Sequence, residues 1–275
     1  MDAPAPASFD DAIAVREVDP ARYRVDVDVA WTASGRAVGG LVEAQLFAGA
    51  AAAMAGSDKQ PLSFTAHLLR APELGSAEVE AEVLREGRTV TNLAVRMTQD
   101  GKLMATALVS FAIGRPGPDL DEQPMPVTDP PSPDRMMDSH VPEFAYPYGH
   151  NIVIQDRMGA APFSASDGPM ERVGWVGFAQ PRPIDAPGLL MFGDIGMMGW
   201  WVRLDREYTT ATLDHTTHFR ADLDAVDAED MVLMWSRTRL VRNGYLDWDV
   251  VIWGPDGTVL CQSRQLLAVL GVTNT

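Results

Sequence analysis

Residues 63–67 read Ser-Phe-Thr-Ala-His, and residues 214–218 read Asp-His-Thr-Thr-His, 151 positions further along the chain. A second pair of short stretches lies 156 positions apart, Asp100-Gly101-Lys102-Leu103 and Asp256-Gly257-Thr258-Val259. An Asp-Gly turn between alternating apolar and polar residues is typical of a β-hairpin. Self-similarity over so long a period favours two fused copies of one small domain over a solenoid of short repeats.

The first half of the chain, on both sides of residues 63–67, is predicted to form one helix and several strands. Apolar and polar residues alternate from Tyr23 to Trp31, which indicates a half-buried strand. The nearly uncharged stretch Leu41–Met54, which follows Gly39-Gly40, predicts a helix that is buried on most sides. Further strands are predicted at 63–69, 76–84, 89–97 and 103–113.

The same order of elements returns in the second half of the chain. Strand-like runs at 151–156 and 172–179 precede a glycine-containing apolar helix at 189–203, and more strands are predicted at 209–219, 231–240, 245–253 and 258–270. The passage between the halves is too rich in proline for a helix or a central strand, so a surface linker is expected there. The predicted domains are therefore 1–114 and 149–275, joined by a linker at 115–148.

An apolar helix bracketed by strands must bury itself against its own sheet. An antiparallel sheet wrapped around one long helix is the arrangement called the hotdog fold. The sequence thus predicts an α+β protein with two tandem hotdog domains, a double hotdog.

The composition and charge of the chain exclude several classes of function. The 275 residues include 22 Lys and Arg against 38 Asp and Glu, a formal charge of −16. Such a charge argues against non-specific binding to nucleic acids or anionic membranes, which needs surplus cations. The lone Cys261 excludes an intrachain disulfide and a multi-thiolate metal site. With no signal peptide and no apolar run of about 20 residues, we expect a cytoplasmic protein with neither nucleic-acid nor membrane partners.

The histidines do not predict a metal site. His215 and His218 are three residues apart, and on a strand that spacing directs their side chains to opposite faces. No other residues supply a set of ligands at metal-binding spacing. We therefore expect structural histidines and no bound metal.

Several short stretches, in order, resemble the double-hotdog acyl-CoA thioesterases of the type II class. They include Val38-Gly39-Gly40, Leu84–Arg88, Phe192-Gly193-Asp194, Ala211–Thr216 and Gln265. The resemblance implies hydrolysis of acyl-CoA thioesters by a water that an Asp, a Thr and a Gln of the second hotdog hold. By position these are Asp194 at the start of the second helix, Thr212 and Gln265. It also implies a homo-oligomer with no cofactor, since coenzyme A is part of the substrate.

The chemistry of these residue types fits that role. A water molecule needs a base to attack a thioester at neutral pH, and Asp194 among apolar neighbours would be poorly solvated and therefore more basic. Thr212 and Gln265 can each donate and accept a hydrogen bond to hold the water.

Other interpretations of the same residues stay open. Asp194 could simply cap a helix after Gly193, Thr212 could be an ordinary strand residue, and Gln265 could face solvent from an edge strand. Glu43, the one acid of the first helix, is either a second candidate base or an exposed position.

An acidic protein needs a local basic patch to bind the phosphates of coenzyme A. The candidates are Arg70 and Arg88 in the first half and Arg237 and Arg239 in the second, because guanidinium groups suit phosphate oxygens. Each could instead balance nearby acids on a solvated strand face. Two other functions remain: a non-catalytic acyl- or CoA-binding protein, and an enoyl-CoA hydratase, whose closely spaced Asp and His loop motif is not found in the sequence.

Overall fold

The computed structural model describes residues 8–33, 35–132, 146–195, 197–223 and 231–272. The chain forms two compact units, which interleave along the sequence. Unit 1 comprises Met1–Ile113, Phe144–Asn151 and Ala186–Asp194, and unit 2 comprises Gly114–Glu143, Ile152–Asp185 and Ile195–Thr275. The predicted domains 1–114 and 149–275 are continuous in sequence, whereas each of these units draws on three segments.

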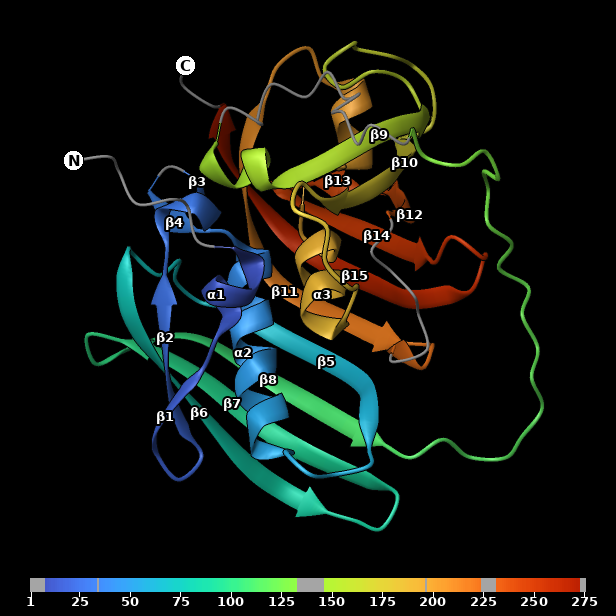
Figure 1. Ribbon diagram of the computed structural model, residues 1–275. Coiled ribbons are helices and arrows are strands. Elements are labelled where there is room, and N and C mark those ends of the chain that lie inside the picture. Colours follow the sequence, from blue (N-terminus) through green and yellow to red (C-terminus); the bar gives the residue numbers. More distant parts are fainter. Residues whose placement is uncertain (1–7, 34, 133–145, 196, 224–230, 273–275) are drawn as a thin grey trace. The chain divides into compact units, whose positions relative to one another are not determined.

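Unit 1 contains one sheet, with the strand order β1-β2-β6-β7-β8-β5 and antiparallel neighbours. Helix α2 contacts β2, β5, β6, β7 and β8, and Figure 1 shows it lying across this sheet. The residues of α2 are apolar on nearly all sides of the helix, and most of them are buried by the sheet and by α3. The elements of unit 1 are α1 (Phe9–Ile13), β1 (Arg16–Asp19), β2 (Arg22–Val27), η1 (Val29–Trp31), β3 (Thr32–Ala33), β4 (Arg36–Ala37), α2 (Gly39–Ala53), β5 (Gln60–Leu68), β6 (Gly75–Glu86), β7 (Val90–Gln99), β8 (Lys102–Ala112), η3 (Pro147–Asn151) and α3 (Ala186–Gly193).

Unit 2 contains an antiparallel sheet with the strand order β9-β10-β12-β14-β15-β11, and β13 pairs with β14. Its elements are β9 (Ile152–Met158), β10 (Glu171–Phe178), η4 (Gly199–Arg203), β11 (Tyr208–Phe219), β12 (Val232–Arg237), β13 (Val241–Arg242), β14 (Tyr245–Trp253) and β15 (Val259–Val272).

The two sheets share their strand order and also their register. In unit 1, β5 pairs with β8 with an irregularity between Pro61 and Ser63, and in unit 2, β11 pairs with β15 with an irregularity between Thr212 and Asp214. The offsets of 151 and 156 residues found in the sequence relate every pair beyond these points. Phe64 opposite Val109, for example, corresponds to His215 opposite Gln265. A shift of the pairing by one residue would turn every side chain of a strand to the other face of the sheet. Since the two sheets have the same pairing, equivalent residues lie on the same face in both.

The second helix is shorter than the sequence predicted. Instead of a helix over 189–203, α3 ends at Gly193, and a separate 3-10 turn, η4, begins at Gly199. Pro187 lies in the first turn of α3, where its missing N–H costs nothing. A Cβ atom on Gly199 would collide with the backbone oxygen of Met170, so contact with a neighbouring segment fixes the chain there. The predicted long helix is therefore wrong for the second half.

The first predicted strand is also shorter than its alternating pattern. β2 ends at Val27, and the residues Val29–Trp31 form the 3-10 helix η1. The Asp28 carboxylate caps η1 by accepting the N–H of Ala30 at 2.8 Å. A single polar cap residue thus ends a strand whose apolar alternation continues for four more positions.

The proline-rich passage packs against unit 2. The indole N–H of Trp175 donates to the Asp129 carbonyl at 2.9 Å, and that of Trp253 donates to the Gln123 carbonyl at 3.0 Å. Met125 and Val127 pack on a buried apolar cluster that contains Trp175, Val251 and Trp253, among others. We call residues 114–132 the strap. The rest of the predicted linker that falls within 133–145 lies outside the described residues.

The corresponding surface of unit 1 is polar. By the shared register, Arg24, Arg96 and Thr98 occupy the positions of Trp175, Val251 and Trp253. Both arginines are exposed. The aromatic surface of unit 2 is therefore matched to its own cover, the strap. Within the described ranges, no helix has the length and apolarity needed to cross a membrane.

Candidate functional site

Thr212 and Gln265 lie on neighbouring strands of unit 2 and contact each other. The Thr212 hydroxyl donates to Gln265 Oε1 at 3.0 Å. Gln265 is only 1% exposed, and its strand β15 lies between β11 and β14. A solvent-facing edge position for Gln265 is therefore wrong, and its amide must be satisfied inside the protein.

Further polar residues, all of them buried, lie beside this pair on the inner face of β11 and β15. His215 lies directly opposite Gln265, and Thr217 lies opposite Ser263. All four side chains are buried, and Thr217 Oγ1 is 3.2 Å from His215 Nε2. We call these residues, together with Thr212, the polar ladder.

Unit 1 shows that the fold does not require a polar ladder. The equivalent positions on β5 and β8 carry apolar residues: Pro61, Phe64, Ala66, Ala107 and Val109. Four of them are buried as deeply as their counterparts in unit 2. Because a buried polar group is costly unless it is hydrogen-bonded, an apolar set would be the cheaper way to build this pair of strands.

Asp194 comes directly after α3, within unit 1. Its carboxylate accepts the backbone N–H of Gly40 at 2.6 Å, at the first turn of α2. Val38, the N-cap residue of α2, supplies no side-chain hydrogen bond to the helix. The half-buried Asp194 thus caps α2. The prediction that it begins the second helix is wrong, and so is a cap on a helix after Gly193, because the helix that Asp194 caps is α2.

Two adjacent glycines allow this contact. A Cβ atom on Gly39 would lie 2.6 Å from Asp194 Oδ2, and one on Gly40 would lie 3.0 Å from the Cα atom of Met191. Only residues without a side chain let α2 approach the end of α3 so closely. The Gly39-Gly40 motif was visible in the sequence, but its partner Asp194 was not, since 154 residues separate the bonded pair.

Glu43 is fully buried in α2. An exposed position is therefore wrong for this residue. As the one acid of its helix, it lies four residues beyond Gly39 and does not belong to the polar ladder of unit 2.

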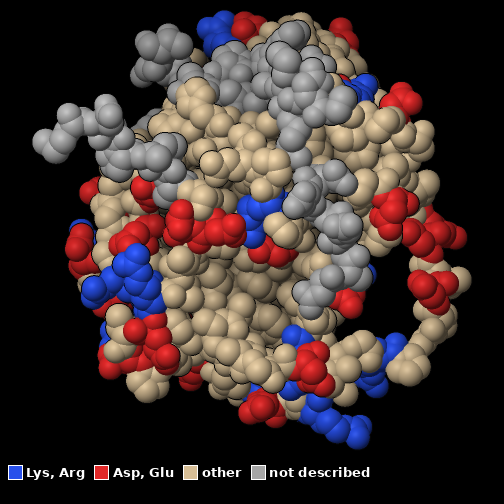
Figure 2. Space-filling model, in the orientation of Figure 1, with Lys and Arg blue, Asp and Glu red and all other residues tan. Residues whose placement is uncertain are grey.

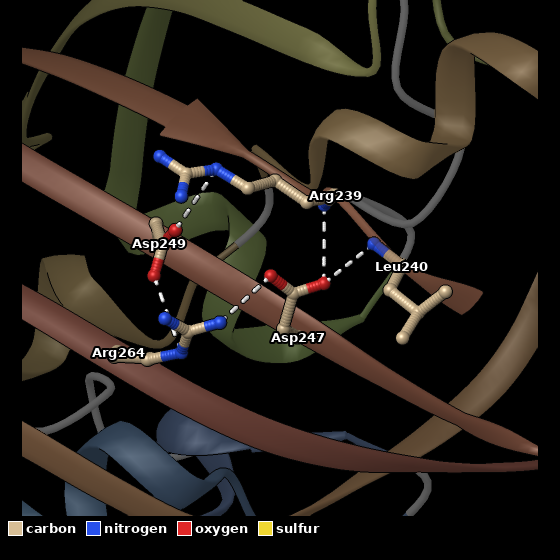
Figure 3. Close-up of polar contacts among 5 residues, drawn as sticks. All are labelled: Arg239, Leu240, Asp247, Asp249 and Arg264. Carbon is tan, nitrogen blue, oxygen red and sulfur yellow. Dashed lines mark hydrogen bonds and ion pairs between the residues drawn. The ribbon is translucent and has the colours of Figure 1, made fainter. Parts of the chain in front are cut away.

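Two of the arginines proposed to bind coenzyme A lie on the outer face of unit 2. Figure 3 shows Arg239 and Arg264 beside Asp249, at 3.7 and 3.5 Å, with Asp247 bonded to Arg264 and to the backbone N–H groups of Arg239 and Leu240. Arg237 pairs with Asp249 across β12 and β14 and is exposed. Since Arg264 and Gln265 are consecutive strand residues, this network and the polar ladder occupy opposite faces of the sheet.

The other two arginines belong to unit 1. Arg70 donates to the Leu103 carbonyl at 2.9 Å, and Arg88 is exposed in the turn between β6 and β7. On the face drawn in Figure 2, Lys and Arg side chains lie beside Asp and Glu side chains. In unit 2, Arg237 and Arg239 therefore lie on the sheet face opposite to the polar ladder.

Neither thiol nor metal chemistry has support at the site. Cys261 is buried, and burial raises the pKa of its thiol far above the usual range, which keeps it protonated. No group of three or more His, Cys, Asp or Glu residues is placed to hold a metal ion among the residues that the structure describes.

Known structures share the fold of this chain. A protein of unknown function with a hotdog fold from Alicyclobacillus acidocaldarius matches with a TM-score of 0.83 and 23% identity, covering 97% of this chain and 98% of the other. The acyl-CoA thioesterase II TesB2 of Mycobacterium marinum matches with a TM-score of 0.75 and 15% identity, over 97% and 98%. The dehydratase domain of RzxB from Pseudomonas fluorescens matches with a TM-score of 0.59 and 12% identity, over 90% and 93%. The hotdog fold is thus shown, but at these identities it does not separate hydrolases from dehydratases.

Family models are more specific than the fold. Residues 27–112 match the model of the acyl-CoA thioesterase N-terminal domain, and residues 121–269 match that of the acyl-CoA thioesterase C-terminal domain. A search of curated proteins found no match to this sequence. Since the model of the C-terminal domain alone spans more than half of the sequence, the chain belongs to the acyl-CoA thioesterase family.

Proposed function

We propose that this protein is a double-hotdog hydrolase that cleaves acyl-CoA thioesters with a water molecule activated by Asp194 and oriented by Thr212 and Gln265. The observation that carries the proposal is the polar ladder. Two strand pairs with the same register bury apolar residues in one copy and His215, Thr217, Ser263 and Gln265 in the other, where the half-buried Thr212 bonds to Gln265. A polar set that the fold does not need indicates a function at this position.

The three groups can divide the chemistry among them. The Asp194 carboxylate removes a proton as the water oxygen attacks the thioester carbonyl carbon, and the carbon–sulfur bond then breaks. The thiol of coenzyme A leaves with a proton, and the acyl group leaves as a free acid. A hydroxyl has one donor and two acceptor lone pairs, so Thr212 can accept a hydrogen of the water while it donates to Gln265.

The contact with α2 suits Asp194 to this role. An anionic carboxylate is stabilised at a helix N-terminus, where backbone N–H groups and the helix dipole point toward it. The hydrogen bond from Gly40 also fixes one carboxylate oxygen and leaves the direction of the other defined. Asp194 is thus held in one orientation, as a general base requires.

The coenzyme A part of the substrate must bind to an acidic protein. Its phosphates call for cations on a protein with a formal charge of −16. Arg237 and Arg239 share a sheet face with Asp247 and Asp249, which makes Arg70 and the exposed Arg88 the better candidates. We also propose that the protein is a homo-oligomer.

The test is release of free thiol from a panel of acyl-CoAs that differ in chain length. We expect turnover by the wild type and a loss of about a hundredfold or more in kcat for Asp194→Asn, which keeps an acceptor for Gly40 but removes the base. Asp100→Asn is the matched control, since this exposed turn residue has a positive φ that asparagine tolerates.

Other outcomes identify the rival functions. Full activity of Asp194→Asn would remove this residue from the mechanism. Binding of acyl-CoA with no thiol release at any chain length would indicate an acyl-CoA-binding protein. Hydration of an enoyl-CoA without thiol release would instead indicate a hydratase.

A further inference from the structure

His215 is a buried polar residue to which the proposed reaction assigns no role. It has no exposed surface and lies directly opposite Gln265 on the neighbouring strand. Residues that face each other across an antiparallel pair have Cβ atoms about 5 Å apart. An imidazole and a primary amide at that separation are close enough to determine each other's orientation.

The first copy of the sheet shows that packing does not explain this histidine. Phe64 is the equivalent of His215 and is equally buried, and it lies opposite Val109, the equivalent of Gln265. The chain can therefore fill this place with an aromatic ring of similar shape that carries no polar atom. A polar ring and a polar amide occur together in the second copy and are both absent in the first.

Thr217 provides the third member of this arrangement. Its hydroxyl lies 3.2 Å from His215 Nε2, and its equivalent in the first copy is Ala66. The Thr217 hydroxyl can either donate to Nε2 or accept from it, so the contact forms with either tautomer of the imidazole. In both cases it restrains the orientation of the ring that lies opposite Gln265.

The orientation of the Gln265 amide matters for the proposed reaction. Its oxygen accepts the Thr212 proton, so its nitrogen must point elsewhere. Turning the amide by half a rotation would place N–H groups against the Thr212 hydroxyl and change the hydrogen bonds offered to a water molecule. We propose that His215 is a positioning residue that holds this amide orientation, with Thr217 fixing the imidazole; its effect on catalysis rests on the proposed thioesterase function.

The kinetic test uses His215→Phe, which installs the residue of the first copy. We expect kcat to fall about tenfold to a hundredfold, as for other small displacements of reacting groups, with KM little changed and a melting temperature at or above that of the wild type. His218→Gln is the matched control, because His218 is exposed on the same strand. Wild-type kcat in His215→Phe would overturn the proposal.

A double-variant comparison tests whether His215 acts through Gln265. In the Gln265→Val background, which has already lost the amide, His215→Phe should cause no further loss of kcat. Independent, multiplying losses would overturn the proposal. Thr217→Val is a second single variant that keeps the side-chain shape, and we expect a smaller fall in kcat in the same direction.

A measurement without turnover separates this proposal from the proposed function. The side-chain amide signals of Gln265 can be assigned in the nitrogen-15 NMR spectrum by their loss in Gln265→Val. We expect them to shift and their protons to exchange faster in His215→Phe and Thr217→Val, but not in His218→Gln. If wild-type protein hydrolyses no acyl-CoA, the function fails while this result still supports the positioning role. Unchanged amide signals in His215→Phe would overturn the role itself.

Discussion

At the scale of single residues, the position of Asp194 depends on residues that have no side chain. Gly39 leaves the space that one carboxylate oxygen occupies, and the N–H of Gly40 binds that oxygen. The carboxylate is thus held by the N-terminus of α2 and its two glycines, although 154 residues separate the bonded pair. Substituting a glycine here is a way to move the acid without changing it.

Gly39→Ala should therefore impair the proposed reaction. The new Cβ atom would lie 2.6 Å from Asp194 Oδ2, so the carboxylate must turn away from Gly40. We expect kcat for thiol release to fall about tenfold to a hundredfold with a smaller change in KM. Gly114→Ala is the control, because a Cβ atom there would meet no atom within 4 Å. An unchanged kcat in Gly39→Ala would show that the position of this carboxylate does not limit the reaction.

Cys261 should be inert in the folded protein. Its thiol is buried, and the pKa is raised by burial, so the reactive thiolate does not form at neutral pH. We expect no reaction with an aromatic disulfide reagent under native conditions and one thiol per chain in denaturant. Rapid labelling of the native protein would show that β15 opens frequently.

At the scale of elements, the sequence predicted strands well where apolar and polar residues alternate and a turn signal follows. β14 occupies the predicted range 245–253, and the turns at Asp100-Gly101 and Asp256-Gly257 lie where the hairpins turn. The separate turn that begins at Gly199 was not predictable, because the collision that a side chain on Gly199 would make with Met170 is a contact between separate segments.

The strap was predicted only in part, for a related reason. Proline density shows that a segment is neither a helix nor a central strand, but not what it covers. Its partners, Trp175 and Trp253, are far away in sequence and look like ordinary strand residues. The strap is thus a tertiary feature of unit 2, which local patterns do not encode.

Shortening the apolar side chains of the strap should destabilise the protein. Met125 and Val127 pack on the cluster that includes Val251 and Trp253, so the Met125→Ala/Val127→Ala double variant loses that burial. We expect the free energy of unfolding to fall by about 1–3 kcal/mol, measured by denaturation in urea. Leu120→Ala is the control in the same segment, because Leu120 is 89% exposed. Equal stability of the double variant and the control would show that the strap contributes little.

At the scale of the whole molecule, two copies of one sheet have diverged on opposite faces. The inner face of unit 2 carries the polar ladder where unit 1 is apolar, and the outer face of unit 2 carries the apolar Trp175 and Val251 where unit 1 carries Arg24 and Arg96. The repeat was visible in the sequence as two short matches. The residues that differ between the copies became informative only when the register showed which positions are equivalent.

This divergence predicts a conflict between stability and function in unit 2. The hydroxyl of Ser263 is buried and has no hydrogen-bond partner among the described residues, and its equivalent in unit 1 is Ala107. Ser263→Ala should therefore raise the free energy of unfolding by about 1 kcal/mol, measured by thermal and urea denaturation. A loss of stability would mean that the hydroxyl is satisfied by a bound water.

The strap also decides where the chain can be divided. A fragment that began at residue 149 would leave Trp175, Val251 and Trp253 facing water, and an apolar patch of this kind promotes association. A fragment that began at Gly114 would carry its own cover and the carbonyl acceptors for both indole N–H groups. A cut that keeps the strap with the surface it covers thus lies before the prolines, so the segment between the two copies packs on only one of them.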